Sequence, residues 1–358
     1  MALASWFGRM PEPLLGVDVG SSSIKLVELG RRRDGRLVLE RRALEPLARG
    51  WMVDGNVEQF DEVAQALRRA VRASGTRTRN AAMALPLASV ITRTIVMPGD
   101  RSDTEQVAHV WSEAERYLPF ALDEASLDFA VLGPASAPGG NVDVTIVASR
   151  EEKVSDRQGL AEVAGLQAVI MDVDACASRR VAGRMISTPS AGPAQALVAL
   201  FDIGMQRSCL QVFRHETLLH EREHGFGGVH MTQLIVERWG VSAHEADAMT
   251  DRVALPDESL GAVYEAFNEH MAQEMARALQ VFFASTPYNR VDHVLLAGAS
   301  AAVPGLAAWV GQRAQCHCQV VHPFEGMALS AHVQGLGIVQ NTSAFVTATG
   351  LAMRRFCQ

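Results

Sequence analysis

Short apolar runs separated by polar turns open the chain, and they predict antiparallel strands. Residues 14–19 and 24–29 are mostly apolar, and a turn of small polar residues, 20–23, separates them. Asp34-Gly35 lies between the second run and residues 37–39. Because Asp-Gly between strand-like runs is typical of a turn whose two central residues take positive φ, we expect a second hairpin there.

Helical spacing follows the strands. Apolar positions recur every three or four residues over 58–73, which predicts an amphipathic helix that Gly75 ends. Three Ser-x-x-Glu sequences, which begin at Ser102, Ser149 and Ser242, are capping boxes that predict the starts of further helices. The helix after Ser102 is expected to end at Pro119 and to bury one stripe, made of Val107, Trp111, Ala114 and Leu118.

The remaining runs alternate between strand and helix, which is typical of an α/β fold. A loop of turn-forming residues, 188–193, is interpreted as the boundary between two halves. In the first half, strands are expected at 81–96 with a break at Pro86, 127–132, 142–148 and 169–173, and a helix at 175–186. In the second half, strands are expected at 196–203, 210–213, 216–223 and 291–296, and helices at 230–239, 243–252, 258–285, 305–314 and 342–354.

One design occurs in both halves: an apolar strand, an aspartate, one apolar residue, a glycine and a polar turn. Asp18 and Gly20 hold these places in the first half, and Asp202 and Gly204 in the second. A tight turn directs successive backbone N–H groups into one concavity that suits phosphate oxygens, and glycine permits close approach of the backbone. An aspartate at each strand end suits Mg²⁺, which it usually holds through water. Two such turns that face each other would grip a triphosphate from both sides.

Composition narrows the function without deciding it. The chain has 358 residues, of which 48% are hydrophobic and 20% charged, and this length favours two or three domains. The formal net charge of −7 argues against a nucleic-acid partner. Five scattered cysteines favour a reducing cytosol, and no secretory leader is recognisable. No apolar stretch approaches the roughly 18 residues of a membrane span, so a partner is expected to hold the protein at any membrane.

Three other features have competing interpretations. Lys25 suits either a phosphate contact or an exposed strand position. Cys316-His317-Cys318 with His322 invites a zinc site, but the spacing fits no common zinc pattern and half-buried strand residues are the better account. The arginines at 31–33 and 41–42 are interpreted as a solvated sheet edge, with weak attraction to anionic lipid or a partner as the alternative.

The order of these elements resembles the actin, Hsp70 and sugar-kinase ATPase superfamily. Within it, the chain resembles the PilM family of type IV pilus assembly proteins, which is related to the cell-division protein FtsA. The resemblance runs nearly end to end, and residues 111–132 are similar to the small subdomain that FtsA and PilM insert into the first domain. The other matching segments are residues 14–29, 161–175, 196–204, 293–306 and 346–355.

The resemblance implies an actin-like ATPase fold with two ribonuclease-H-like domains and ATP with Mg²⁺ in the central cleft. The implied first domain is 1–190 with an inserted subdomain at about 91–170, the second is 191–340, and 341–358 is a C-terminal helix that returns to the first domain. The implied partner is the N-terminal cytoplasmic peptide of the inner-membrane protein PilN, and through it the PilN/PilO complex. The protein would then be cytoplasmic and peripheral to the inner membrane.

The family's loops map onto this chain residue by residue. Asp18, Gly20, Ser21, Ser22, Ser23 and Lys25 match the first phosphate loop; Asp202 and Gly204 match the second; Gly298 and Ala299 match the adenosine loop. The resemblance assigns the metal to Asp18 and Asp202, and less directly to Asp172 or Asp174. The chain departs from the family's small residues at Met205, Gln206 and Arg207, and Arg207 is interpreted as either a phosphate contact or a solvent-exposed cation.

Two other functions fit the same fold. A sugar-kinase-type phosphotransferase needs a carboxylate base, for which Asp172 or Asp174 are candidates, but no polar sugar-binding cluster surrounds them. An FtsA-like filament former usually carries a membrane anchor, and the chain shows no amphipathic tail after Arg355. A nucleotide-binding scaffold is therefore favoured, at most a weak ATPase, and self-association and ATP turnover stay open.

Overall fold

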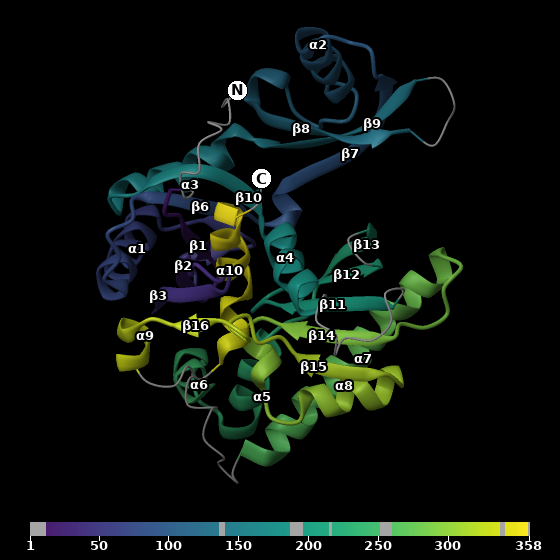
Figure 1. The fold of residues 1–358 in the computed structure, drawn as a ribbon. Coiled ribbons are helices and arrows are strands. Elements are labelled where there is room, and N and C mark those ends of the chain that lie inside the picture. Colours follow the sequence, from purple (N-terminus) through teal and green to yellow (C-terminus); the bar gives the residue numbers. More distant parts are fainter. Residues whose placement is uncertain are drawn as a thin grey trace.

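The computed structural model describes residues 12–135, 140–186, 196–214, 217–250, 260–336 and 341–356 (Figure 1). Its largest sheet has six strands in the order β10-β6-β1-β2-β3-β16. Strand β1 pairs antiparallel with β2 and parallel with β6, so the first hairpin stands at the centre of the sheet. In sheet order the strands are Gln167–Val173, Asn80–Leu85, Leu15–Val19, Ser23–Arg31, Leu37–Pro46 and Ala328–Leu329.

Helices cover both faces of this sheet. Helices α1 (Phe60–Ser74) and α3 (Glu151–Val163) pack against one face, where Leu26 and Leu67 are fully buried. Helix α10 (Val346–Met353) packs against the other face, on Val27. Alternate residues of β2 thus enter different cores, as the period of two in a strand requires. Helix α1 ends where the pattern predicts, because Gly75 takes a left-handed φ of 65°.

The second sheet has five strands in the order β13-β12-β11-β14-β15. These strands are Thr217–His224, Ser208–Arg214, Leu197–Ile203, His293–Ala297 and His317–Val320. One face packs on α5 (Val229–Trp239), α7 (Gly261–Ser285) and α8 (Leu306–Ala314), and α6 (Ala243–Thr250) packs beside α5. Phe201, Phe267 and Phe282 fill this core and are fully buried. Each large sheet therefore has a hydrophobic core of its own.

A small three-stranded sheet, ordered β7-β9-β8, stands at the top of the view in Figure 1. Its strands are Val90–Pro98, Asn141–Arg150 and Ala125–Pro134, and α2 (Asp103–Ala114) packs on it around Ile95, Val110 and Val144. The unit ends with β9 at Arg150, whereas α3 and β10 belong to the six-stranded sheet. The segment expected at about 91–170 is therefore longer than the unit that the strands form.

Helices α4 (Asp174–Ile186) and α10 lie between the two large sheets and cross closely (Figure 1). A Cβ added at Gly350 of α10 would lie 2.0 Å from the Ala177 carbonyl oxygen of α4. Likewise, a Cβ at Gly16 of β1 would lie 2.0 Å from the Ala348 carbonyl oxygen. Glycine permits both approaches, and the last helix consequently packs against the first strand of the chain.

Local expectations were mostly met, with a few errors; for example, α2 ends at Ala114 and not at Pro119. Ser102 and Ser242 form the predicted capping boxes, but the Ser149 hydroxyl donates to the Ser89 carbonyl oxygen and α3 begins without a side-chain cap. In α2 the exposed fraction of Val107 is 42%, because the buried stripe is Val110 and Ala114. The turn at Asp34-Gly35 has one residue with positive φ, Gly35, because three further residues lengthen the loop.

Some expectations lie outside the described residues. They include the boundary loop 188–193, the beginning of the strand at 216, the end of the helix at 252 and the start of the helix at 258. Within the described ranges, no helix combines the length and the apolar composition needed to cross a bilayer.

Candidate functional site

The two aspartate turns have the same backbone construction. In the β1–β2 hairpin, Asp18 is the register partner of Lys25, and the Gly20 N–H donates to the Ser23 carbonyl oxygen at 3.1 Å. In the β11–β12 hairpin, Asp202 is the partner of Cys209, and the Gly204 N–H donates to the carbonyl oxygen three residues later at 2.9 Å. The repeat seen in the sequence is therefore a repeat of structure.

Both turns line one central cavity between the two large sheets. Ten of the eleven candidate residues line it: Asp18, Gly20, Ser21, Ser22, Lys25, Asp202, Gly204, Arg207, Gly298 and Ala299. Ser23 is the exception, because its side chain is buried and its carbonyl oxygen closes the first turn. The convergence that the sequence argument requires is thus present.

Lys25 is a buried member of the site, which excludes the alternative of an exposed strand lysine. Its exposed fraction is 8%, and its Nζ lies 3.1 Å from the Asp18 carboxylate. A Cβ at Gly20 would lie 2.8 Å from this Nζ, so the glycine leaves room for the cation as well as for the tight turn. A cross-strand ion pair at this position presents one positive and one negative charge to the cavity.

Asp202 is held from two helices. The Ser178 hydroxyl of α4 donates to its Oδ2, and the Thr347 hydroxyl of α10 donates to the same atom at 3.5 Å. Burial raises the pKa of Asp202, the Ser178 hydrogen bond opposes that rise, and the Asp18 carboxylate adds to it. Neither hydroxyl belongs to a recognisable motif, so sequence reasoning missed both.

Asp174 and Asp172 separate into different environments. Asp174 lines the cavity, and its Oδ1 accepts from the N–H groups of Leu87 and Ala175 at 3.0 and 2.6 Å. Burial and the nearby Asp202 raise its pKa well above the usual range for a carboxyl. Asp172 instead pairs with Arg180 at 3.2 Å and is not part of the cavity lining. Of the two weaker metal candidates, only Asp174 reaches the site.

Arg157 of α3 is a buried cation that no motif marks. It lines the cavity with an exposed fraction of 3%, and its Nη2 donates to the Gly55 carbonyl oxygen at 2.8 Å. Its Nε finds no hydrogen-bond partner in the described ranges of the chain. Burial lowers the pKa of Arg157, and the carboxylates of Asp156, Asp18 and Asp174 oppose the change. The guanidinium thus balances part of the negative charge of the cavity.

The third turn, at Gly298, lines the cavity and is packed on strand β11. Gly298 has a φ of 90°, and a Cβ there would lie 2.2 Å from the Ile203 carbonyl oxygen. Its N–H donates to the Ser343 carbonyl oxygen at 3.1 Å, and the Ser343 hydroxyl donates to the Gly298 carbonyl oxygen at 2.8 Å. The segment before α10 therefore shapes the cavity, which the sequence did not reveal.

The charges of the cavity fit a magnesium–phosphate group better than a bare metal ion. Asp18, Asp174 and Asp202 repel one another across it, as the raised pKa values of Asp174 and Asp202 indicate. Within the described residues, no three acidic, histidine or cysteine side chains are placed to hold a metal jointly. Mg²⁺ bound to phosphate suits this cavity, because it would reduce the repulsion between the carboxylates. It also needs few protein ligands, since Mg²⁺ keeps several waters and binds few protein carboxylates.

Arg207 is exposed to solvent and is paired with carboxylates of both domains. It pairs with Asp54 at 3.1 Å and with Glu223 at 3.6 Å. Asp54 belongs to the hairpin of β4 (Met52–Val53) and β5 (Asn56–Val57), and its N–H also donates to the Gln206 side chain at 3.3 Å. The bulky residues of the second turn thus serve as contacts between the domains.

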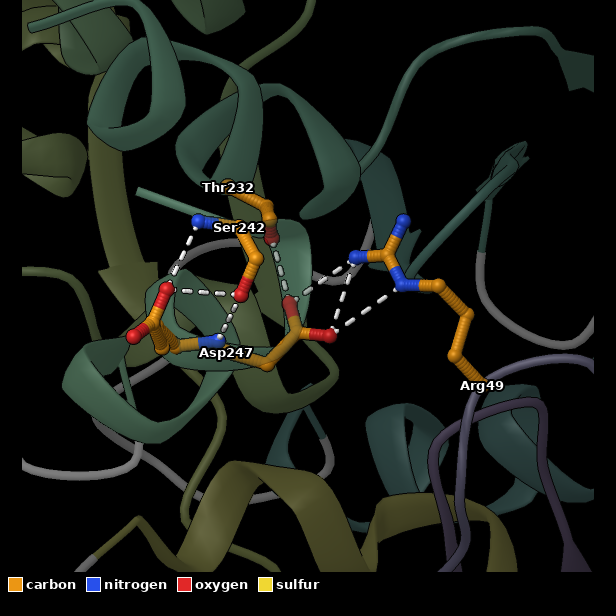
Figure 2. A network of polar contacts seen from close by, with 5 residues as sticks. Arg49, Thr232, Ser242 and Asp247 are labelled. Carbon is orange, nitrogen blue, oxygen red and sulfur yellow. Dashed lines mark hydrogen bonds and ion pairs between the residues drawn. The ribbon is translucent and has the colours of Figure 1, made fainter. Parts of the chain in front are cut away.

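A second bridge between the domains lies nearby, as Figure 2 shows. Arg49 precedes β4, and its guanidinium donates to both carboxylate oxygens of Asp247 in α6 at 2.9 and 3.2 Å. The Thr232 hydroxyl of α5 donates to this carboxylate at 2.8 Å and orients it.

The central cavity has a volume of about 210 Å³, below the roughly 300 Å³ at which small-molecule pockets usually begin. A cavity of this size favours opening of the bridges between the domains if a nucleoside triphosphate binds.

Loss of the bridges should loosen the cleft at little cost in stability. In the double variant Arg49→Ala/Asp54→Asn, we expect faster amide hydrogen exchange in residues 204–207 and 49–57. The expected loss is about 0.5 kcal/mol of unfolding free energy per pair, because these side chains are largely exposed. Arg69→Ala is the matched control, since it removes a 2.6 Å pair with Glu45 inside the first domain. Equal exchange in control and double variant would contradict this role.

Asp174 gives the site a dependence on pH. Because its native pKa is raised, the folded protein keeps a proton that the unfolded chain loses above about pH 4. The free energy of unfolding should therefore fall as pH rises from there toward the native pKa. Asp174→Asn should reduce this fall and raise stability at neutral pH in magnesium-free urea titrations. Asp172→Asn loses an ion pair and should instead lower the stability at neutral pH. If Asp174→Asn left the pH dependence of unfolding unchanged, Asp174 would not be its source.

Comparison with known proteins decides the family. The model for type IV pilus assembly protein PilM matches residues 16–356. The chain belongs to the PilM family. A solved structure of the PilM-PilN type IV pilus biogenesis complex is 27% identical, with a TM-score of 0.76, covering 96% of this chain and 98% of that one. This agreement confirms the actin-like ATPase fold and the PilM resemblance.

More distant solved structures share the fold with this PilM family member. The ethanolamine utilization protein EutJ from Carboxydothermus hydrogenoformans is 16% identical, with a TM-score of 0.57 and coverage of 96% and 90% of the two chains. A diol dehydratase-reactivating factor in nucleotide-free form is 10% identical, with a TM-score of 0.52 and coverage of 96% and 99%. At these identities the likeness concerns the fold alone.

Proposed function

We propose that this PilM family member is a nucleotide-binding scaffold of type IV pilus assembly that binds the N-terminal cytoplasmic segment of PilN. The match to the PilM-PilN complex supports PilN as the partner, because it spans nearly all of both chains at a TM-score of 0.76. The scaffold would then be cytoplasmic and would reach the inner membrane, and the PilN/PilO complex, through that segment.

The nucleotide part of the proposal rests on the central cavity. The two aspartate hairpins and the Gly298 turn line one space, and Lys25 and Arg157 supply cations to it. Backbone N–H groups of the turns with Ser21 and Ser22 would bind phosphate oxygens. Asp18 and Asp202 would hold the waters of Mg²⁺, which would neutralise phosphate charge when bound. ATP is the nucleotide that the family resemblance implies.

Hydrolysis is proposed to be weak at most. Asp54 and Glu223 already engage Arg207, and the cleft is narrow while these pairs persist. Asp174 lines the cavity as a potential base, but its raised pKa means that below this pKa it already carries a proton and cannot accept another. These features favour binding and conformational change over turnover, and they favour a scaffold over a sugar kinase.

A titration of the full chain with a synthetic PilN N-terminal peptide tests the partner. Calorimetry should show saturable 1:1 binding, and a peptide of the same composition in scrambled order should release no heat. Repeating the titration with Mg-ATP present reports whether the cavity and the peptide site are coupled, since coupling must be reciprocal. Absence of heat with folded protein and the native peptide would refute the PilN assignment.

A further inference from the structure

A second hollow lies in the first domain, apart from the central cavity, and arginine side chains dominate its described lining. They come from the β2–β3 hairpin, the loop between α1 and β6, and the turn after α10. The five are Arg31, Arg41, Arg77, Arg79 and Arg355. Two carboxylates, Glu28 and Glu40, line the same hollow. Its lining thus carries more positive than negative charge on a chain whose net charge is −7.

The loop between α1 and β6 holds two of these arginines in a fixed alternation. Thr76 and Thr78 are buried, and their hydroxyls donate to the two carboxylate oxygens of Glu28 at 2.6 and 2.8 Å. Arg77 and Arg79 alternate with them and are exposed. The threonines therefore satisfy the hydrogen bonding of the Glu28 carboxylate and fix the backbone of the loop. The arginines between them are exposed to solvent.

Two guanidinium groups of the hollow, those of Arg41 and Arg31, are oriented by main-chain oxygens and an aromatic ring. Arg41 donates to the main-chain carbonyl oxygens of Glu40 at 2.8 Å and Gly75 at 3.4 Å. The Arg31 guanidinium lies 4.6 Å from the ring centre of Phe356. Within the described part of the chain, Arg77 and Arg79 have no side-chain partner. Beyond the hollow, the exposed Arg32, Arg33 and Arg36 extend the positive surface along the hairpin tip.

We propose that this arginine-lined hollow binds the phosphate groups of anionic phospholipids and holds this face of the first domain against a membrane. Guanidinium groups bind phosphate oxygens through two parallel hydrogen bonds and are always charged. Clusters of four to eight basic residues are typical of surfaces that adsorb to anionic bilayers. Among the described residues, the lining contains no aromatic side chain on which a nucleobase would stack. Phosphate is therefore the group recognised.

The amino-acid composition of residues 1–11 favours a bilayer over an acidic protein. Pro13 lines the hollow, and the eleven residues before Glu12 include Trp6, Phe7 and Arg9. Tryptophan and basic residues are the types enriched where a polypeptide meets the head groups of a membrane. An acidic peptide, by contrast, would be bound by the arginines alone, and the tryptophan would have no role in binding it.

Co-sedimentation of the full chain with vesicles tests the proposal. Vesicles of phosphatidylcholine with 30% phosphatidylglycerol, a fraction chosen to be roughly that of an anionic bacterial membrane, should bind the protein, and pure phosphatidylcholine vesicles should not. Binding should weaken as salt rises. The triple variant Arg31→Gln/Arg77→Gln/Arg79→Gln should lower the partition coefficient by about tenfold or more. The matched control replaces three exposed arginines of the second domain, Arg238, Arg290 and Arg313, and should bind like the wild type.

Further measurements distinguish binding of lipid from binding of other anions. The corresponding Arg→Lys triple variant should keep most of the binding, which separates loss of charge from loss of fold. Inorganic pyrophosphate and a polyglutamate peptide are titrated against wild-type and triple-variant protein. Tight binding of either ligand at this site without vesicle binding would overturn the proposal. Equal partition of wild type and the Arg→Gln triple variant onto anionic vesicles would also overturn it.

Discussion

Asp202→Asn should abolish the dependence of nucleotide affinity on magnesium while the protein stays folded. Asparagine keeps an oxygen that accepts from Ser178 and Thr347, and it removes a carboxylate whose pKa burial raises. The fold therefore loses a costly charge and no hydrogen bond from these helices. The metal loses one of the two proposed carboxylates that hold its waters, and groups in that role typically contribute about 10–100-fold to metal affinity.

The measurement is a titration of a fluorescent ATP analogue with and without Mg²⁺. Wild-type protein should bind the analogue more tightly with the metal, and Asp202→Asn should bind it about equally weakly in both buffers. Asp172→Asn is the control, because Asp172 lies close in sequence to Asp174 but pairs with Arg180 outside the cavity. Wild-type metal dependence in Asp202→Asn would show that this carboxylate does not serve the cation. Weak binding by the wild type itself would reject the nucleotide site.

Gly16→Val should unfold or severely destabilise the first domain. Any Cβ at this position meets the Ala348 carbonyl oxygen at 2.0 Å and the Ala352 backbone nitrogen at 2.6 Å. Both atoms belong to the backbone of α10, so no side-chain rotation relieves the overlap, and the helix has to leave β1. Overpacking usually costs about 1–3 kcal/mol, and a clash with a helix backbone lies at or above the upper end of that range.

Urea unfolding followed by circular dichroism measures this effect. Gly350→Val should behave similarly, because its Cβ would meet the Ala177 carbonyl oxygen of α4. Gly183→Ala is the control within α4, since a Cβ there meets nothing within 4 Å. Alanine in a helix interior is worth about 1 kcal/mol more than glycine, so this variant should gain stability. A Gly16→Val midpoint close to that of the wild type would disprove the tight packing of α10.

The sequence was sufficient for the parts of the site that local backbone chemistry determines. Asp18 and Asp202 lie near the ends of apolar strands, two residues before a glycine. This pattern places both next to the turn of a β-hairpin. It was insufficient where tertiary packing decides. Arg157 reaches the cavity from α3, whose charged sequence gives no sign of a buried face toward a ligand. Ser178 and Thr347 likewise become neighbours of Asp202 only when α4 and α10 cross.

Similar limits explain the errors in the fold. A Ser-x-x-Glu sequence predicts a cap only if the serine is free, and Ser149 is still paired in β9. Val107 fits helical spacing, but the small sheet packs against Val110 in its place, together with the predicted Ala114. Gln206 and Arg207 depart from the small residues of the family's loop, and the sequence did not reveal that they contact the β4–β5 hairpin of the other domain. Each error concerns a partner that lies far away in sequence.

The position of α10 has a consequence for biosynthesis. The strands of the first sheet emerge early from the ribosome, yet β16 and α10, which complete that sheet and cover its second face, are translated near the end. The second sheet has all its strands once β15 is made, although Val346 of α10 also packs on its second face. Although domains usually fold in the order of synthesis, the sheet whose strands are made first is therefore the later one to receive its last strand.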